Sequence, residues 1–131
     1  MTVLPALTPI SLIGQQTSCE TITLPTGTHV FRRGSPADAI YGVHRGIVEL
    51  IDARGEKTCY RAGEFFSFND IVCRESVHRS HALARTPVEV FRLERPHFLN
   101  LLHHQPTLAI QLIGQEHLRL REQRSSGTCC Y

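Results

Sequence analysis

The sequence predicts a mainly β fold, a sandwich or barrel with flanking helices and a long C-terminal helix. Between residues 20 and 93, short runs of β-branched and aromatic residues alternate with turn signals at a spacing of about 8–12 residues. Glycines fall between these runs, where a rolled sheet would turn its corners. After Leu93, the hydrophobic period changes from about two to about 3.6 residues, which indicates helices.

The first half of the β region contains three expected strands. Polar and apolar residues alternate over Thr21–Leu24, as in a half-buried strand, and Pro25-Thr26-Gly27 predicts the turn that follows. His29–Phe31 and Ile40–Val43 are the next two expected strands. The turn signal Arg33-Gly34-Ser35-Pro36 separates them.

The second half begins with an expected hairpin. Its strands are Ile47–Ile51 and Thr58–Tyr60, and the loop Asp52-Ala53-Arg54-Gly55 carries a glycine where a positive φ is needed. Two more strands, His81–Ala84 and Val88–Leu93, are expected further on. Strands this short, with turns between them, favour a sandwich or barrel over a parallel α/β sheet.

Helices are expected at both ends of the β region. A short helix is expected after Thr8-Pro9, and another over Arg95–Leu102, with a proline near its first turn. A longer helix should run from Thr107 to about Arg124, with Leu108 and Leu112 facing the body of the domain. A second stripe at heptad-like spacing predicts a homodimer through this helix, and its residues are Ile110, Ile113, His117 and Leu120.

The length of 131 residues predicts one domain. Its expected parts are a lead-in over residues 1–19, the domain over 20–124 and a flexible tail over 125–131. The net charge of +2 does not by itself indicate nucleic-acid binding. No apolar run reaches the roughly 18 residues of a membrane span. The five irregularly spaced cysteines and the lack of a secretory signal favour the cytoplasm.

The order of glycine, aromatic and valine positions over roughly residues 20–124 resembles one family, the cyclic-nucleotide-binding domain of the catabolite activator and fumarate–nitrate reductase regulators. The matching runs are Leu24-Pro25-x-Gly27, Phe31-x-x-Gly34-x-x-Ala37, Ile40-Tyr41-x-Val43-x-x-Gly46-x-Val48, Ala62-Gly63-Glu64-Phe65-Phe66 and Arg79-Ser80-x-Ala82. The resemblance implies an eight-stranded β-roll, a cupin-like jelly roll or double-stranded β-helix, whose last long helix commonly forms the dimer. Family members usually append a helix-turn-helix. Since none follows here, direct DNA binding is not expected.

The resemblance also implies a phosphate-binding cassette between Phe66 and Ser80. In the family, backbone N–H groups and an arginine hold the cyclic phosphate, and a glutamate accepts a hydrogen bond from the ribose 2′-hydroxyl. Ser67 stands at the family glycine, Phe68 at the family glutamate, and Arg79 matches the family arginine. The ribose carboxylate is therefore missing. The candidate ligand-binding residues are Phe66, Ser67, Phe68, Asn69, Arg79 and Ser80.

Simpler interpretations of the same residues stay open. Arg79 can pair on the surface with a carboxylate such as Glu64, and the two serines can be ordinary loop residues. Phe66 and Phe68 are expected to be core aromatics in either case. Asn69-Asp70 predicts a turn or an N-cap before a short helix.

The predicted function is that of a regulatory sensor and not of an enzyme, because no catalytic constellation is visible. A cyclic nucleotide or another small anion would dock at the cassette, and the C-terminal helix would then change the contacts with a second copy or a regulatory protein. One alternative is a scaffold for protein interaction that binds no ligand. Another is a metal-dependent cupin enzyme, favoured only by the eight histidines, which include no His-x-His pair. No metal site is predicted.

Overall fold

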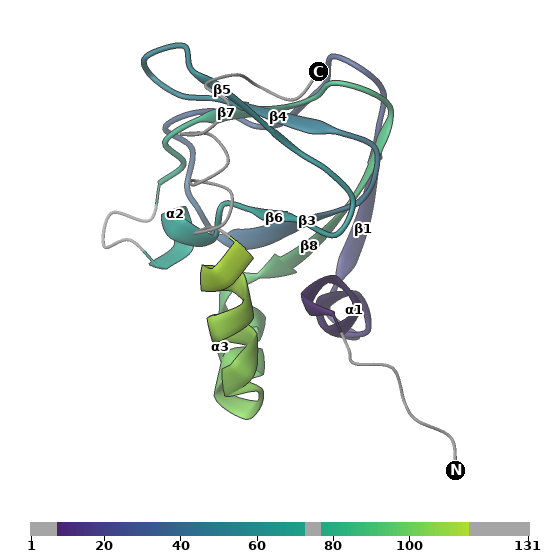
Figure 1. Cartoon of the computed structure of the whole chain (residues 1–131), viewed down its shortest axis with the longest axis vertical. Coiled ribbons are helices and arrows are strands. Elements are labelled where there is room, and N and C mark those ends of the chain that lie inside the picture. The colour runs from purple at the N-terminus through teal and green to yellow at the C-terminus, as the bar shows by residue number, and fades with distance from the viewer. Residues whose placement is uncertain (1–7, 73–76, 116–131) are drawn as a thin grey trace.

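The computed structural model describes residues 8–72 and 77–115, which form a β-roll of two four-stranded sheets with helices on one side (Figure 1). The predicted fold class is confirmed. The sheet orders are β1-β8-β3-β6 and β2-β7-β4-β5, and all strand pairs are antiparallel. The elements are α1 (Pro9–Gly14), β1 (Glu20–Leu24), β2 (His29–Phe31), β3 (Ala39–Arg45), β4 (Val48–Ile51), β5 (Lys57–Tyr60), β6 (Phe65–Phe66), α2 (Phe68–Val72), β7 (His81–Ala84), β8 (Val88–Glu94) and α3 (Arg95–His104). Residues 106–115 are also helical.

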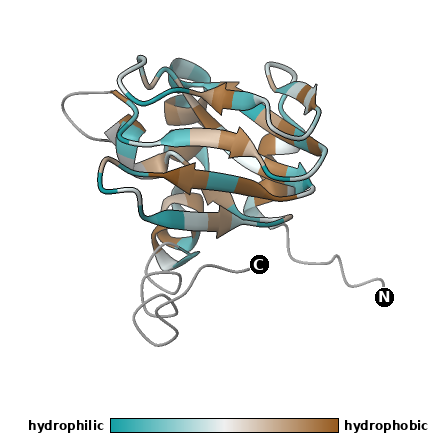
Figure 2. Cartoon of the chain, turned by 90° about the horizontal axis from the view of Figure 1, so that it is seen from above, coloured by the Kyte–Doolittle hydropathy of each residue, from teal (hydrophilic) through white to brown (hydrophobic). Residues whose placement is uncertain are grey.

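The register of each sheet places apolar residues opposite one another. Burial alternates along β7, whereas residues 39–43 of β3 are all buried because both faces of that strand pack in apolar clusters. Val90 of β8 lies opposite Ile22 of β1 on one side and Val43 of β3 on the other. In the second sheet, Leu50 of β4 lies opposite Ala82 of β7. Figure 2 shows hydrophobic and hydrophilic residues following one another along the strands. One face of each strand is thereby available for the core.

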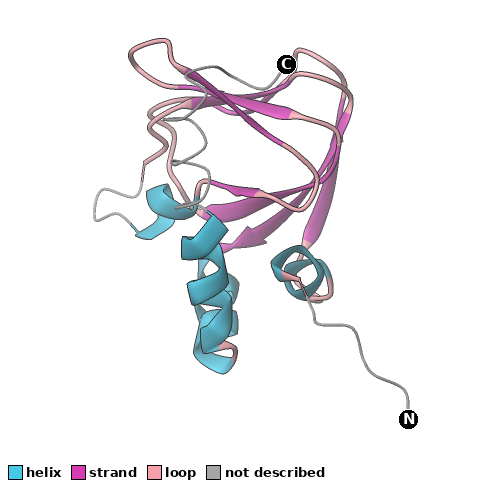
Figure 3. Ribbon diagram, viewed as in Figure 1, coloured by secondary structure: helices cyan, strands magenta, loops and turns pink. Residues whose placement is uncertain are grey.

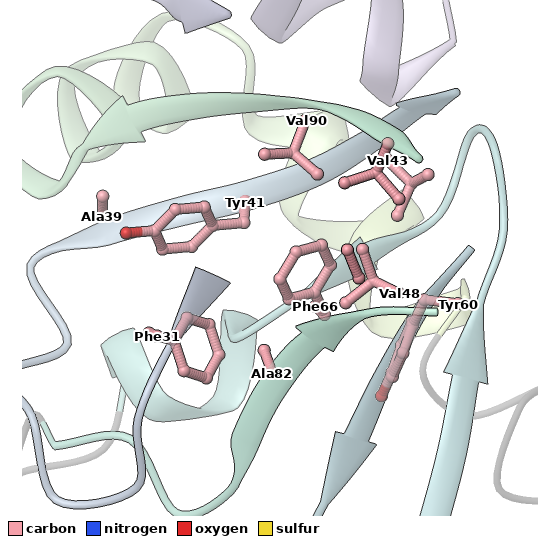
Figure 4. Packing of buried hydrophobic residues seen from close by; sticks show 11 residues of the cluster. Phe31, Ala39, Tyr41, Val43, Val48, Tyr60, Phe66, Ala82 and Val90 are labelled. Atoms are coloured by element: carbon pink, nitrogen blue, oxygen red, sulfur yellow. The ribbon is translucent and has the colours of Figure 1, made fainter. Parts of the chain in front are cut away.

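The space between the two sheets is filled by a core of aromatic and small apolar side chains (Figure 4). Phe66 is fully buried there, and its ring lies 5.7 Å from that of Tyr41 and 5.9 Å from that of Tyr60. Phe31 lies 5.9 Å from Phe66 between ring centres. Because these rings come from β2, β3, β5 and β6, the core links both sheets.

A second apolar cluster lies on the outer side of the β1-β8-β3-β6 sheet, where the helices pack (Figure 3). Leu93 of β8 and Phe98 of α3 are fully buried in it. Leu108 and Leu112 of the 106–115 helix are buried in the same cluster, which confirms that they face the body of the domain. Within the described residues, no helix is both long and apolar enough to cross a membrane.

Most predicted elements are confirmed, with shifts of one or two residues at their ends. Thr8 caps α1 by accepting a hydrogen bond from the Ser11 amide at 3.3 Å, as expected of a helix that starts after Thr8-Pro9. The long helix is confirmed over residues 106–115. Its predicted continuation to Arg124, with His117 and Leu120, lies outside the described residues, as do the tail 125–131 and residues 1–7 of the lead-in.

One local prediction is wrong. Asn69-Asp70 is not a turn or an N-cap, because α2 already begins at Phe68 and contains both residues. The helix starts earlier because Ser67 reverses the chain directly after β6, with a φ of 80°. Asp70 consequently lies inside the first turn of the helix and is buried.

Gly46 occupies the tightest of the turns between strands. It has a φ of 89° between β3 and β4, and a Cβ at this position would overlap the carbonyl oxygen of Pro87. The neighbouring Ile47 amide donates to the Thr86 hydroxyl at 3.0 Å. The β3–β4 and β7–β8 turns are therefore packed directly against each other, which only a residue without a side chain allows.

Candidate functional site

The candidate site is the described part of the predicted cassette, residues 66–72 and 77–80, at the end of the roll where α2 leaves β6 (Figure 1). The two phenylalanines of this segment pack in different clusters. Phe66 belongs to the core between the sheets, whereas Phe68 is half-buried in the helical cluster and meets the ring of Phe98 edge-on at 6.1 Å. Both are core aromatics, as expected.

Ser67 joins β6 to α2 in a left-handed backbone conformation, with a φ of 80°. It is buried, and its hydroxyl lies 3.5 Å from the carbonyl oxygen of Ala39. A residue with a Cβ pays roughly 1–2 kcal/mol for this conformation. The backbone at this position therefore has the form that suits glycine, although the sequence supplies serine.

We expect Ser67→Gly to be more stable than Ser67→Ala by about 0.5–1 kcal/mol, because glycine avoids the left-handed penalty but loses more entropy on folding. Both variants lack the hydroxyl, so the comparison isolates the backbone. Urea denaturation of the two variants measures the difference. Equal midpoints would contradict the prediction, because the strain at residue 67 would then be no larger than the extra entropy that glycine loses on folding.

A buried hydrogen bond joins the two described parts of the cassette. The Nδ1 of His78 donates to the Asp70 carboxylate, with the two atoms 3.1 Å apart, and both residues are buried. The His78 ring also stacks on Phe31, with ring centres 3.5 Å apart and planes 4° from parallel. The imidazole is thus fixed by a hydrogen bond on its edge and by an aromatic ring on its face.

Arg79 and Ser80 follow His78 directly in the chain, and His78 contacts Asp70 of α2. Arg79 is exposed and Ser80 is half-exposed, which leaves both side chains accessible to a ligand from solution. The fold therefore brings together the candidate residues 66–69 and 79–80.

Asp70 and His78 were not among the predicted site residues. The sequence gives only a weak indication of their pairing. Two titratable residues in a region of apolar strands need hydrogen-bond partners if they are buried. Their pairing depends on the chain returning to α2 after residues 73–76, which no local pattern specifies. Among the described residues, no group of three or more His, Cys, Asp or Glu side chains could hold a metal ion.

Two groups on the strands of the roll, His29 and Arg92, have shifted pKa values. Burial lowers the pKa of His29, and electrostatic interactions with Arg32 and His81 lower it further. Burial also disfavours charge on Arg92, but its hydrogen bond to the Tyr41 hydroxyl and the carboxylates of Asp38 and Glu20 leave the pKa of this guanidinium raised. Arg92 consequently pairs with two carboxylates, those of Glu20 and Asp38.

The family model described as the cyclic nucleotide-binding domain matches residues 21–105. The chain belongs to this family. The matched region covers both sheets, the described cassette and α3, so the family assignment and the observed β-roll agree.

The domain is also similar to a curated protein, the cAMP-dependent protein kinase regulatory subunit of Aspergillus fumigatus, with 32% identity over 85 residues. This match covers 63% of the chain and only 20% of the fungal protein.

Solved structures with the same fold include bacterial regulators. The catabolite activator protein of Thermus thermophilus has 24% identity and a TM-score of 0.70, with 86% of the chain and 54% of that structure covered. The c-di-GMP responsive regulator CLP of Xanthomonas campestris has 21% identity and a TM-score of 0.72, with 82% and 57% covered. The sensor domain of the regulator DNR from Pseudomonas aeruginosa has 22% identity and a TM-score of 0.65, with 88% and 78% covered.

Proposed function

We propose that the domain is a regulatory sensor that binds a small anionic ligand at the cassette and is not an enzyme. The candidate ligand-binding residues are Phe66, Ser67, Phe68, Asn69, Arg79 and Ser80. The proposal is supported by the Asp70–His78 contact of 3.1 Å, which joins α2 to the residue before the exposed Arg79, in a fold of the cyclic nucleotide-binding family. A guanidinium at this place suits a phosphate, which it can bind through two hydrogen bonds.

The proposed ligand class is a cyclic nucleotide or a similar small anion. The names of the similar proteins support this class, since they refer to cAMP and to c-di-GMP. Phe68 stands where the family glutamate would meet the ribose, and its ring packs against Phe98 instead. We therefore expect cAMP and its 2′-deoxy analogue to bind equally well.

Isothermal titration with cAMP, 2′-deoxy-cAMP, cGMP and cyclic di-GMP tests the proposal. We expect Arg79→Ala to weaken binding of the best of these ligands at least about tenfold, because a charge-assisted contact to phosphate is lost. Arg54→Ala is the matched control, since Arg54 is exposed in the β4–β5 loop. If none of the four ligands binds the wild type, or if both variants bind alike, the sensor proposal is wrong.

We further propose that residues 20–124 act as one unit and that its last helix carries the output. In the described part of that helix, Ile110 is 71% exposed and Ile113 is 57% exposed, whereas Leu108 and Leu112 are buried. Two large apolar side chains on the outer side favour pairing with the same helix of a second copy or with a regulatory partner. His117 and Leu120 would extend this stripe.

Sedimentation velocity is expected to show a dimer for the wild type and a monomer for Ile113→Asp. The aspartate would place a charge in the apolar contact between the two helices. Gln111→Asp is the matched control, because Gln111 is exposed on the same helix but is not part of the stripe. A wild-type monomer at all concentrations, or a dimer of Ile113→Asp, would contradict the proposal.

A scaffold that binds no ligand is the second candidate. The packing of Phe68 against Phe98 favours it. In the family this position carries the glutamate that binds the ribose, whereas here its side chain packs α2 against α3. A dimer that binds none of the four ligands would support the scaffold. A cytoplasmic location is proposed for either function, supported by the odd number and irregular spacing of the five cysteines.

A further inference from the structure

We propose that Asp70 and His78 are positioning residues of the anion site, which hold the segment of Arg79 and Ser80 in place against α2. The inference rests on the proposed function and names two residues that lie outside the candidate ligand-binding set. Neither residue is offered as a ligand contact, because both are buried. Their effect on the ligand would pass through the backbone of residues 77–80.

The side chains of Asp70 and His78 link α2 to the segment that precedes β7. The side chain of His78 is 1% exposed and that of Asp70 is 11% exposed, so their contact of 3.1 Å is largely shielded from water. A carboxylate accepts hydrogen bonds, so Nδ1 of His78 must carry the proton. If one partner is removed, the other stays buried without a hydrogen-bond partner. Breaking the contact therefore costs free energy of folding.

The backbone of His78 is fixed as firmly as its side chain. Its carbonyl oxygen accepts from the Gly34 amide at 2.8 Å, and its own amide donates to the Ser35 carbonyl at 2.9 Å. A bridge between Pro36 and Val77 continues this contact by one residue. The loop 34–36 thus holds one side of the segment and Asp70 holds the other.

The aromatic surroundings explain why the imidazole cannot turn to another partner. Its face lies on Phe31, and the ring of Tyr41 is tilted against it at 6.2 Å between ring centres. Rotation of His78 about its side-chain bonds would lose the Phe31 stack together with the hydrogen bond. The orientation of the His78 backbone, and with it the direction in which Arg79 leaves the chain, is therefore coupled to Asp70.

Three single variants separate positioning from general stability. His78→Phe keeps an aromatic ring for the Phe31 stack but removes the donor, and Asp70→Ala removes the acceptor. Asp70→Asn is the conservative variant, because its amide oxygen can still accept from Nδ1. The readouts are hydrogen exchange of the ligand-free protein at the Gly34 and His78 amides, and titration with cAMP, cGMP and cyclic di-GMP.

We expect Asp70→Ala and His78→Phe each to speed exchange at Gly34 and His78 about tenfold or more, while exchange at Val90 in the centre of β8 stays unchanged. The same two variants should weaken binding of the best ligand about tenfold or more, and Asp70→Asn should restore most of both properties. Unchanged exchange in Asp70→Ala would overturn the proposal. So would faster exchange without weaker binding, because the pair would then be structural only. If the wild type binds none of the three ligands, the proposed function fails, and the exchange data alone decide whether the pair fixes this segment.

Discussion

Replacing Gly46 with alanine is expected to lower the free energy of unfolding by about 3 kcal/mol, because the new methyl group has no space. It would overlap the Pro87 carbonyl oxygen and would lie 2.8 Å from a methyl carbon of Val88 and 2.9 Å from the Thr86 hydroxyl. The backbone atom cannot move without disturbing the β7–β8 turn. The alanine must also adopt a φ of 89°.

Gly55→Ala is the matched control for this prediction. Gly55 has a similar φ of 83°, but a Cβ there would meet nothing within 4 Å. Its substitution should therefore cost only the left-handed backbone term of roughly 1–2 kcal/mol. Urea denaturation of both variants gives the difference between them as the cost of the overlap. Equal losses would show that the two turns are not tightly packed.

The second large effect is expected at the ion pair between Glu49 of β4 and Arg85. Their nearest atoms are 2.7 Å apart, and the Glu49 side chain is only 4% exposed. Arg85→Met leaves that carboxylate buried without its partner, and we expect a loss of about 3 kcal/mol in the free energy of unfolding. Adding Glu49→Gln to this variant should recover part of the loss, because a neutral amide costs less to bury than a charge.

The pair between Arg45 and Glu89 provides the control in the same fold. Its nearest atoms are 3.9 Å apart and the Arg45 side chain is 74% exposed, so water and salt screen the charges. Arg45→Met should change the free energy of unfolding by less than about 0.5 kcal/mol. Thermal and urea denaturation of the two methionine variants compare them directly. A similar loss in both would mean that the burial of Glu49 does not matter.

The β-roll could be predicted from the sequence because each strand and turn has a local residue pattern. Alternating apolar residues and turn glycines are local, and they specify where a strand such as Thr21–Leu24 lies and which of its faces is buried. Leu108 and Leu112 could likewise be assigned to the buried face of their helix by spacing alone. Helical and strand periods are therefore enough to recover this architecture.

The interior of the cassette could not be predicted in the same way. Ser67 adopts a backbone conformation that its residue type disfavours, so sequence rules placed the start of the short helix too late. The Asp70–His78 contact depends on how the chain returns after residues 73–76, and neither residue has a pattern that announces its partner. The resemblance to the family indicated the candidate residues, and the fold adds the Asp70–His78 contact beside them.

The pairing of β1 with β8 has a consequence for how the protein folds. Glu20 lies opposite Arg92, so the first strand of the roll pairs with the last one. During synthesis, β1 emerges early and has no neighbour until β8 has left the ribosome. Contacts so distant in sequence slow folding, because a long chain must be ordered before they form. Any fragment that stops before Val88 would lack β8, one of the two central strands of that sheet, and its exposed edges would favour aggregation.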